Sequence, residues 1–143
     1  MKICIGSDHG GYELKEYLKT VLKKDGYEVL DVGCNSKDSV HYPIYGQAVA
    51  KKVSSDEFEK GILICTTGIG MSMTANRFKG VRAALCHNED SAKMSRLHNN
   101  SNILVFGAKY QPPQQAEKIL KVWLNTGFEA GRHLDRIKLI DNK

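Results

Sequence analysis

The sequence predicts an α/β fold in which a five-stranded parallel sheet carries helices on both faces. Two observations support this prediction. Short apolar runs rich in branched residues are typical of buried strands, and amphipathic segments with helical spacing separate them along the chain. This alternation favours parallel strands, because each helix returns the chain to begin the next strand in the same direction. The 143 residues, 41% of them hydrophobic, suffice for one domain with a substantial core.

The elements follow from apolar spacing and from Gly and Pro positions. Leu14, Leu18 and Val21 mark a helix that Asp25-Gly26 ends, and Pro43 suits a first helical turn. The predicted strands are Lys2–Gly6, Tyr27–Val32, Ile62–Cys65, Val81–Cys86 and Asn102–Phe106. The predicted helices are Tyr12–Lys24, Pro43 to about Ser54, Met71–Phe78, about Glu89–Leu97, Pro112-Pro113 to Gly127, and Arg132–Ile140.

Composition favours a cytoplasmic protein that binds an anionic small molecule. The net charge is +5, but Lys and Arg are spread along the chain, so no nucleic-acid partner is expected. No apolar run approaches the roughly 20 residues of a membrane span, and Met1–Gly6 lacks the features of a signal peptide, so no membrane partner is expected. The four cysteines form no C-x-x-C pair, which argues against a zinc ribbon or a thioredoxin-type site.

The chemistry is expected at Cys65–Gly70, a thiol at the end of a strand followed by a glycine loop and a helix start. The first amides of a helix lack partners, and glycines let backbone N–H groups approach an anion closely. The positive field of the helix start also favours the thiolate form of Cys65. This segment could therefore supply both a base and an anion hole.

Two other interpretations of this segment are disfavoured by its residues. A dinucleotide fingerprint needs a third glycine where Met73 stands, and a cysteine phosphatase needs an arginine where Met71 stands. The remaining chemistry is proton transfer at a carbon next to a carbonyl, which needs a base, donors for an enediolate oxygen and a proton shuttle between sugar oxygens. This chemistry requires no metal and no cofactor.

Fold topology predicts where the polar residues gather. Ligands of parallel sheets bind outside the carboxyl ends of the strands. The side chains expected on that rim are those of Asp8, His9, Tyr42, Cys65, Thr67 and Lys109. His98 and Asn99 follow a helix and belong near the opposite rim, which suggests a site shared between two chains.

Arg132 and Arg136 share one helix face and could clamp a phosphate. Such a pair more often forms a solvated basic face of a helix than a phosphate site. Likewise, His98 could simply end a helix, and Asp8 could simply cap a turn. Their joint presence with Cys65 is what favours a sugar-phosphate site.

Five segments, taken together and in order, resemble the type B ribose 5-phosphate isomerases and their wider family, which includes allose and galactose 6-phosphate isomerases. They are G-S-D-H-G-G at Gly6–Gly11, H-Y-P at His41–Pro43, I-L-I-C-T-T-G-I-G-M-S at Ile62–Ser72, R-L-H-N-N at Arg96–Asn100 and G-R-H-L-D-R at Gly131–Arg136. The resemblance implies a Rossmann-like α/β/α sandwich. It also implies a homodimer or tetramer with shared active sites, and a single domain over residues 1–143 whose C-terminal helix, about 131–143, reaches a partner chain.

The resemblance also implies roles for individual residues in interconverting ribose 5-phosphate and ribulose 5-phosphate through a cis-enediol(ate). Cys65 matches the base, His98 the ring-opening acid and Thr67 its helper. The residues that match the anion hole and the ligands of the sugar and phosphate are Thr66, Gly68, Ile69, Gly70, Asp8, His9, Tyr42, Asn99, Lys109, Arg132 and Arg136.

Three residues depart from the family pattern. Thr66 replaces the first glycine of C-G-T-G, so its Cβ would restrict the backbone wherever a positive φ is needed. His41 replaces the acid of D-Y-P, and Lys109 stands where many members carry Arg. An allose or galactose 6-phosphate isomerase is therefore the nearest alternative, and a non-catalytic sugar-phosphate binding protein is another.

Overall fold

The computed structural model describes residues 1–142 and shows one five-stranded, wholly parallel sheet. The strand order is β2-β1-β3-β5-β4. The strands are β1 (Lys2–Ser7), β2 (Glu28–Asp31), β3 (Lys60–Cys65), β4 (Ala83–Leu85) and β5 (Ile103–Gly107). The pairing of β1 with both β2 and β3, and of β5 with both β3 and β4, is parallel throughout. The predicted α/β sandwich is confirmed.

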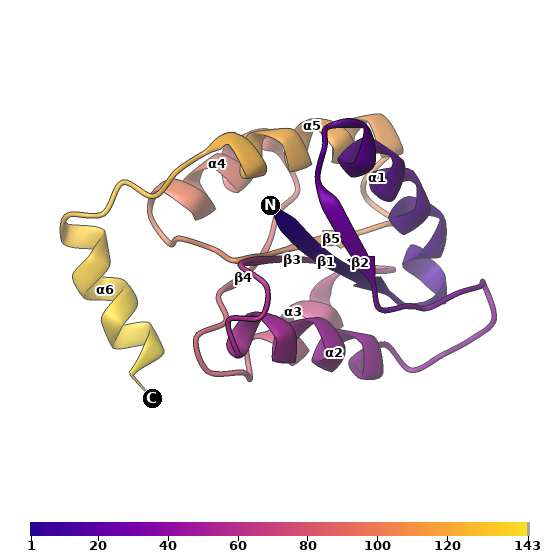
Figure 1. Ribbon diagram of the computed structural model, residues 1–143, viewed down its shortest axis with the longest axis horizontal. Helices are drawn as coiled ribbons and strands as arrows, with labels where there is room; N and C mark the ends of the chain where they lie inside the picture. The colour runs from indigo at the N-terminus through magenta and orange to yellow at the C-terminus, as the bar shows by residue number, and fades with distance from the viewer. Residues whose placement is uncertain (143) are drawn as a thin grey trace.

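Helices cover both faces of this sheet, as Figure 1 shows, with α1, α4 and α5 on one face and α2 and α3 on the other. The helices are α1 (Tyr12–Lys24), α2 (Tyr42–Ser54), α3 (Ile69–Ala75), α4 (Glu89–Leu97), α5 (Pro113–Asn125) and α6 (Arg132–Asp141), with a 3-10 turn at His9–Gly11 before α1. The last helix, α6, lies apart from both layers beside the end of α4 (Figure 1).

Alternation along the strands divides the core into two layers. In β3, Ile62 and Ile64 face the layer of α1 and α5, whereas Leu63 and Cys65 face the layer of α2 and α3. All four residues are buried, because a central parallel strand is covered on both faces. Cys65 thus leaves the core at the carboxyl end of the sheet on the α2–α3 side.

Most predicted bounds differ from the structure by one or two residues, and the third helix and the strand after it differ most. The third helix spans Ile69–Ala75 instead of Met71–Phe78, because Gly68 adopts the left-handed φ of +79° that starts it and Asn76 ends it. The Asn76 side chain exchanges two hydrogen bonds with the backbone of Ala83, at 3.0 and 2.8 Å. The strand that follows, β4, has three residues instead of the six predicted, and it lies at the edge of the sheet, where it pairs with β5 alone.

A polar network fixes the far end of α4. Arg96 is buried, and its guanidinium donates to the carbonyl oxygens of Ser101 at 2.6 Å and Thr126 at 3.1 Å. The Trp123 indole donates to the Ser101 hydroxyl at 2.8 Å. Because these groups are satisfied, the turn that carries His98 is held to α5. Within residues 1–142, no helix has the length and apolar character needed to span a membrane.

Candidate active site

Cys65 ends β3 with its thiol directed at the loop that follows. The side chain is 5% exposed, and its Sγ accepts a hydrogen bond from the Gly68 amide at 3.1 Å. Gly68 has no room for a side chain, because a Cβ there would lie 3.0 Å from the Phe106 backbone and the φ of +79° is left-handed. The loop after β3 therefore folds back so that the Gly68 amide points at the sulfur.

Thr67 turns its hydroxyl toward the start of α3, where Oγ1 accepts the Ile69 amide at 3.3 Å. The Thr66 carbonyl accepts the Lys109 amide at 2.9 Å. Gly68 is the left-handed residue of this loop, and Thr66 is not. The extra Cβ of Thr66 consequently imposes no backbone strain, so this departure from the family pattern leaves the path of the loop intact.

The turn after β1 brings Asp8 and His9 to the same rim. Asp8 is 6% exposed, and its Oδ1 accepts the Gly11 amide at 3.1 Å, which caps the short turn. His9 Nδ1 accepts the Val40 amide at 3.2 Å. A neutral imidazole that accepts at Nδ1 carries its proton on Nε2, so His9 can donate that proton to a ligand.

Two more predicted residues complete this rim. The Tyr42 ring lies against Gly70, where an added Cβ would come within 2.5 Å of the Tyr42 Cζ. Lys109 is exposed and lines a cavity of about 360 Å³ together with Gly10, Thr66 and Gln111. We call Asp8–Gly11, Tyr42, Cys65–Gly70 and Lys109 the carboxyl-end rim.

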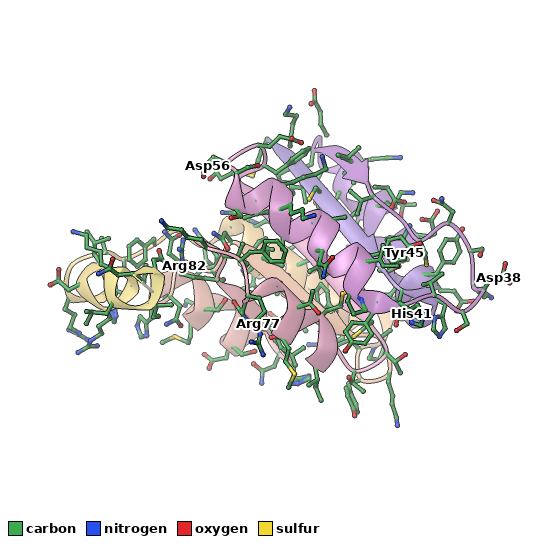
Figure 2. All side chains as sticks on the ribbon, turned by 90° about the horizontal axis from the view of Figure 1, so that it is seen from below. Asp38, His41, Tyr45, Asp56, Arg77 and Arg82 are labelled. Carbon is green, nitrogen blue, oxygen red and sulfur yellow. The ribbon has the colours of Figure 1, made fainter. Side chains whose placement is uncertain are left out.

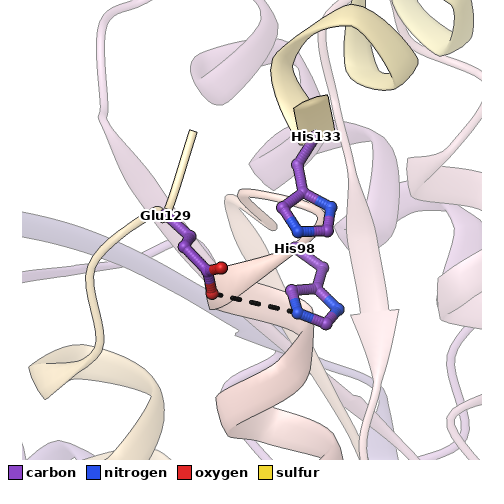
Figure 3. A group of neighbouring side chains, drawn as sticks. All are labelled: His98, Glu129 and His133. Carbon is purple, nitrogen blue, oxygen red and sulfur yellow. Dashed lines mark ion pairs between the residues drawn. The ribbon is translucent and has the colours of Figure 1, made fainter. Parts of the chain in front are cut away.

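The remaining predicted residues lie elsewhere, around α6 and the end of α4. The His98 ring stacks on His133 with 4.1 Å between centroids and 14° between planes, and its Nε2 lies 3.9 Å from Glu129 Oε2 (Figure 3). Arg132 and Arg136 are exposed on α6, and neither makes an ion pair among residues 1–142. Asn99 is exposed and lines a cavity of about 640 Å³ beside Ile140. We call His98, Asn99, Glu129, Arg132, His133 and Arg136 the α6 cluster.

Two members of the α6 cluster, Glu129 and His133, were not among the predicted site residues. His133 is 6% exposed, and its Nε2 is buried without a hydrogen-bond partner among the described residues. Burial lowers the pKa of His133, and the neighbouring His98 and Arg132 act in the same direction. The signal was present in the spacing: His133 and Ile137, four residues apart, form the buried face of α6.

In the side-chain conformations of this structure, the α6 cluster does not have the geometry of a metal site. One ligand atom each from His98, Glu129 and His133 lies within 4.8 Å of the others. However, imidazole lone pairs lie in the ring plane, and the two planes are nearly parallel. The lone pairs therefore run side by side instead of converging on one ion at the roughly 2 Å that zinc requires.

The carboxyl-end rim and the α6 cluster lie far apart in the chain. Figure 2 shows His41, next to Tyr42, at the end of the molecule opposite to α6, and Arg82 lies beside α6. The Arg82 guanidinium holds Asp141 of α6 at 2.8 Å. Cys65 ends β3, whereas His98 lies shortly before the start of β5, which pairs in parallel with β3, so the two residues lie at opposite edges of the sheet.

Comparison with known proteins places this architecture in a family. A family model described as Ribose/Galactose Isomerase matches residues 3–140. The chain belongs to the ribose/galactose isomerase family. It is 42% identical over 139 residues to ribose-5-phosphate isomerase B of Escherichia coli, covering 97% of this chain and 93% of that one. It is also 47% identical over 143 residues to a putative sugar phosphate isomerase of Bacillus subtilis, covering 99% and 96%.

Solved structures of family members share the fold. Ribose-5-phosphate isomerase B of Clostridium thermocellum superposes with a TM-score of 0.98 at 48% identity, covering 99% of this chain and 96% of that one. The enzyme of Mycoplasma genitalium with bound ribulose-5-phosphate gives 0.95 at 38% identity, covering 99% and 94%. The prediction of a sugar-phosphate isomerase is confirmed at the level of the family, while the sugar and the residue roles remain predictions.

Proposed function

We propose that this protein interconverts ribose 5-phosphate and ribulose 5-phosphate through a cis-enediol(ate), with Cys65 as the base. The observation that carries the proposal is the Cys65 sulfur, which meets the Gly68 amide at 3.1 Å at the mouth of the rim. A thiolate stabilised there can remove the C2 proton of the open aldose and return it to C1. The proton of the C2 hydroxyl passes to O1 in the same isomerisation, which leaves a ketone at C2.

The loop amides would stabilise the charge that develops on the sugar oxygens. The amides of Gly68 and Ile69 are engaged by the Cys65 sulfur and the Thr67 hydroxyl. The amides of Thr66, Thr67 and Gly70 are then the donors proposed for the enediolate oxygen. Asp8, His9 and Tyr42 border the same rim and would hold the sugar, while Lys109 would meet the phosphate with a single charged group.

The α6 cluster would complete the site from a second chain of a homodimer. His98 would open the sugar ring by moving the proton of the C1 hydroxyl to the ring oxygen, and Asn99, Arg132 and Arg136 would bind the sugar and its phosphate. Three apolar side chains of α6, Leu134, Leu139 and Ile140, are 40%, 75% and 55% exposed, which suits a helix that reaches a partner. Lys143, the last residue of that predicted segment, lies outside the described residues.

The proposal is tested by replacing Cys65 with Ala and measuring turnover and ligand binding separately. Turnover of ribose 5-phosphate should fall by about 10³-fold or more, while the protein still binds the sugar phosphate, because only the base is removed. Cys86→Ala is the matched control, since Cys86 is also buried and burial raises the pKa of its thiol. Unchanged turnover in Cys65→Ala would contradict the mechanism. A wild-type protein that binds sugar phosphates without converting them would indicate a binding protein.

A six-carbon substrate is the second candidate, because the matching family model also covers galactose isomerases. Ribose 5-phosphate, allose 6-phosphate and galactose 6-phosphate should be compared by kcat/KM under one set of conditions. The proposal requires the five-carbon sugar to be preferred. Preference for either six-carbon sugar would move the assignment to that substrate.

A further inference from the structure

We infer that the Thr66 side chain is a positioning residue that fixes the turn after β1 against the loop after β3. This inference rests on the proposed function and assigns a role to a side chain for which the enediolate mechanism uses only the backbone. Thr66 occupies the space that a side chain at Gly10 would need, since a Cβ built on Gly10 would overlap Thr66 Oγ1 and lie 3.3 Å from Thr66 Cβ. The two residues are complementary in size.

The contact lies where the sheet no longer holds the two segments together. The last backbone hydrogen bond between the ends of β1 and β3 is donated by the Asp8 amide to the Ile64 carbonyl, at 3.2 Å. Beyond it, the turn carries Asp8 and His9, whereas the loop carries Cys65 and Thr67. The Thr66–Gly10 contact joins the two segments at this point.

Thr66 is also attached to a third segment. Its carbonyl accepts the Lys109 amide at 2.9 Å, and the neighbouring Cys65 carbonyl accepts the Ala108 amide at 2.9 Å. Gly10, Thr66 and Lys109 line the same cavity of about 360 Å³. Thr66 therefore sets the spacing of three groups of the rim: the sugar-binding turn, the base and the phosphate-binding lysine.

The chemistry of the threonine side chain suits this role. A β-branched side chain carries two γ atoms, so few rotations clear the space in front of Gly10. Gly10 does not adopt a left-handed φ, so an alanine there would meet no backbone strain of its own. Both residues are exposed, which makes the contact accessible to substitution without opening the core.

These features define a compensating pair of substitutions. Gly10→Ala should raise KM about tenfold with a smaller effect on kcat, because the displaced turn carries Asp8 and His9 while Cys65 stays in place. Adding Thr66→Gly should restore KM to within about threefold of the wild type, because it removes the atoms that an alanine at position 10 would strike. Thr66→Gly alone, which removes the contact, should raise KM about threefold, because the turn is then held less firmly against the loop.

Gly127→Ala is the matched control, because Gly127 has no neighbour within 4 Å of a built Cβ and no left-handed φ. Thermal unfolding of every variant separates a loss of folding from a loss of alignment. A double variant no better than Gly10→Ala, or a Thr66→Gly variant with the KM of the wild type, overturns the positioning role. A wild-type protein without turnover instead overturns the proposed function, so the two failures are distinguishable.

Discussion

The carboxyl-end rim and the α6 cluster hold their functional groups by different means. On the rim, backbone contacts fix the groups: the Cys65 sulfur accepts the Gly68 amide, and the Thr66 carbonyl accepts the Lys109 amide. In the α6 cluster, Arg132 and Arg136 are exposed side chains on a helix that lies away from the sheet (Figure 1). One half of the proposed site is thus preset by the sheet, and the two arginines of the other half would be ordered by a partner chain.

The largest expected effect is the loss of turnover when either the rim or the α6 cluster loses its acid–base group, and its recovery when two such variants are mixed. Cys65→Ala and His98→Asn should each lose about 10³-fold or more in turnover, because each removes one acid–base group. Co-expressed with different affinity tags, the two variants should regain about a quarter of the wild-type activity, since half of the dimers are mixed and each mixed dimer holds one intact site of two.

The control for this mixing experiment is a chain that carries both substitutions. Mixed with Cys65→Ala, it cannot form an intact site and should remain inactive. Mixed dimers of the two single variants that form but show no turnover would place the whole site within one chain.

The next largest effect is a loss of kcat/KM when the loop after Cys65 is altered at Gly68. Gly68→Ala should lower kcat/KM by about 100-fold, because the new Cβ would press on the Phe106 backbone and shift the donors around Cys65. Gly80→Ala isolates the backbone cost, since Gly80 has a φ of +76° but no neighbour within 4 Å. Both substitutions should cost about 1–2 kcal/mol of unfolding free energy from the left-handed φ alone. Equal kcat/KM in the two variants would contradict the steric argument.

A smaller effect should follow from removing charge from α6. Arg136→Ala should raise KM for the sugar phosphate about tenfold with little change in unfolding temperature, because the exposed guanidinium has no ion-pair partner among residues 1–142. Lys138→Ala on the same helix is the control for lost positive charge. If both variants raise KM equally, α6 acts as a diffuse basic face and not as a phosphate clamp.

The smallest effect is a pH dependence of stability in the α6 cluster. Burial, His98 and Arg132 lower the pKa of His133 in the folded chain, so the unfolded chain binds more protons below its ordinary pKa near 6.5. The stability contributed by neutral His133 is therefore present above that pH and declines as the pH falls through it. His133→Phe keeps a ring for stacking and should flatten the unfolding temperature between about pH 7.5 and 5.5. An unchanged slope would show that other groups carry the dependence.

Local patterns in the sequence determined most of the fold. The helices at Tyr12–Lys24 and Glu89–Leu97 were predicted with the bounds that the structure shows, because apolar spacing and caps are local signals. The third helix was placed two residues late at its start, and it ends earlier than predicted. Its end depends on Asn76, whose partner Ala83 belongs to the next strand, and no helical periodicity could show this contact.

The sequence by itself determined which groups could perform chemistry and, through the order of strands and helices, which end of the sheet each would reach. Only the tertiary structure decided how they meet. It placed Thr66 against Gly10 and stacked His98 on His133. The physical reason is that these contacts join residues far apart in the chain, and their spacing follows from strand register and helix packing. The parallel pairing of Ser7 with Ile64 sets the first of them, and residue types alone do not specify it.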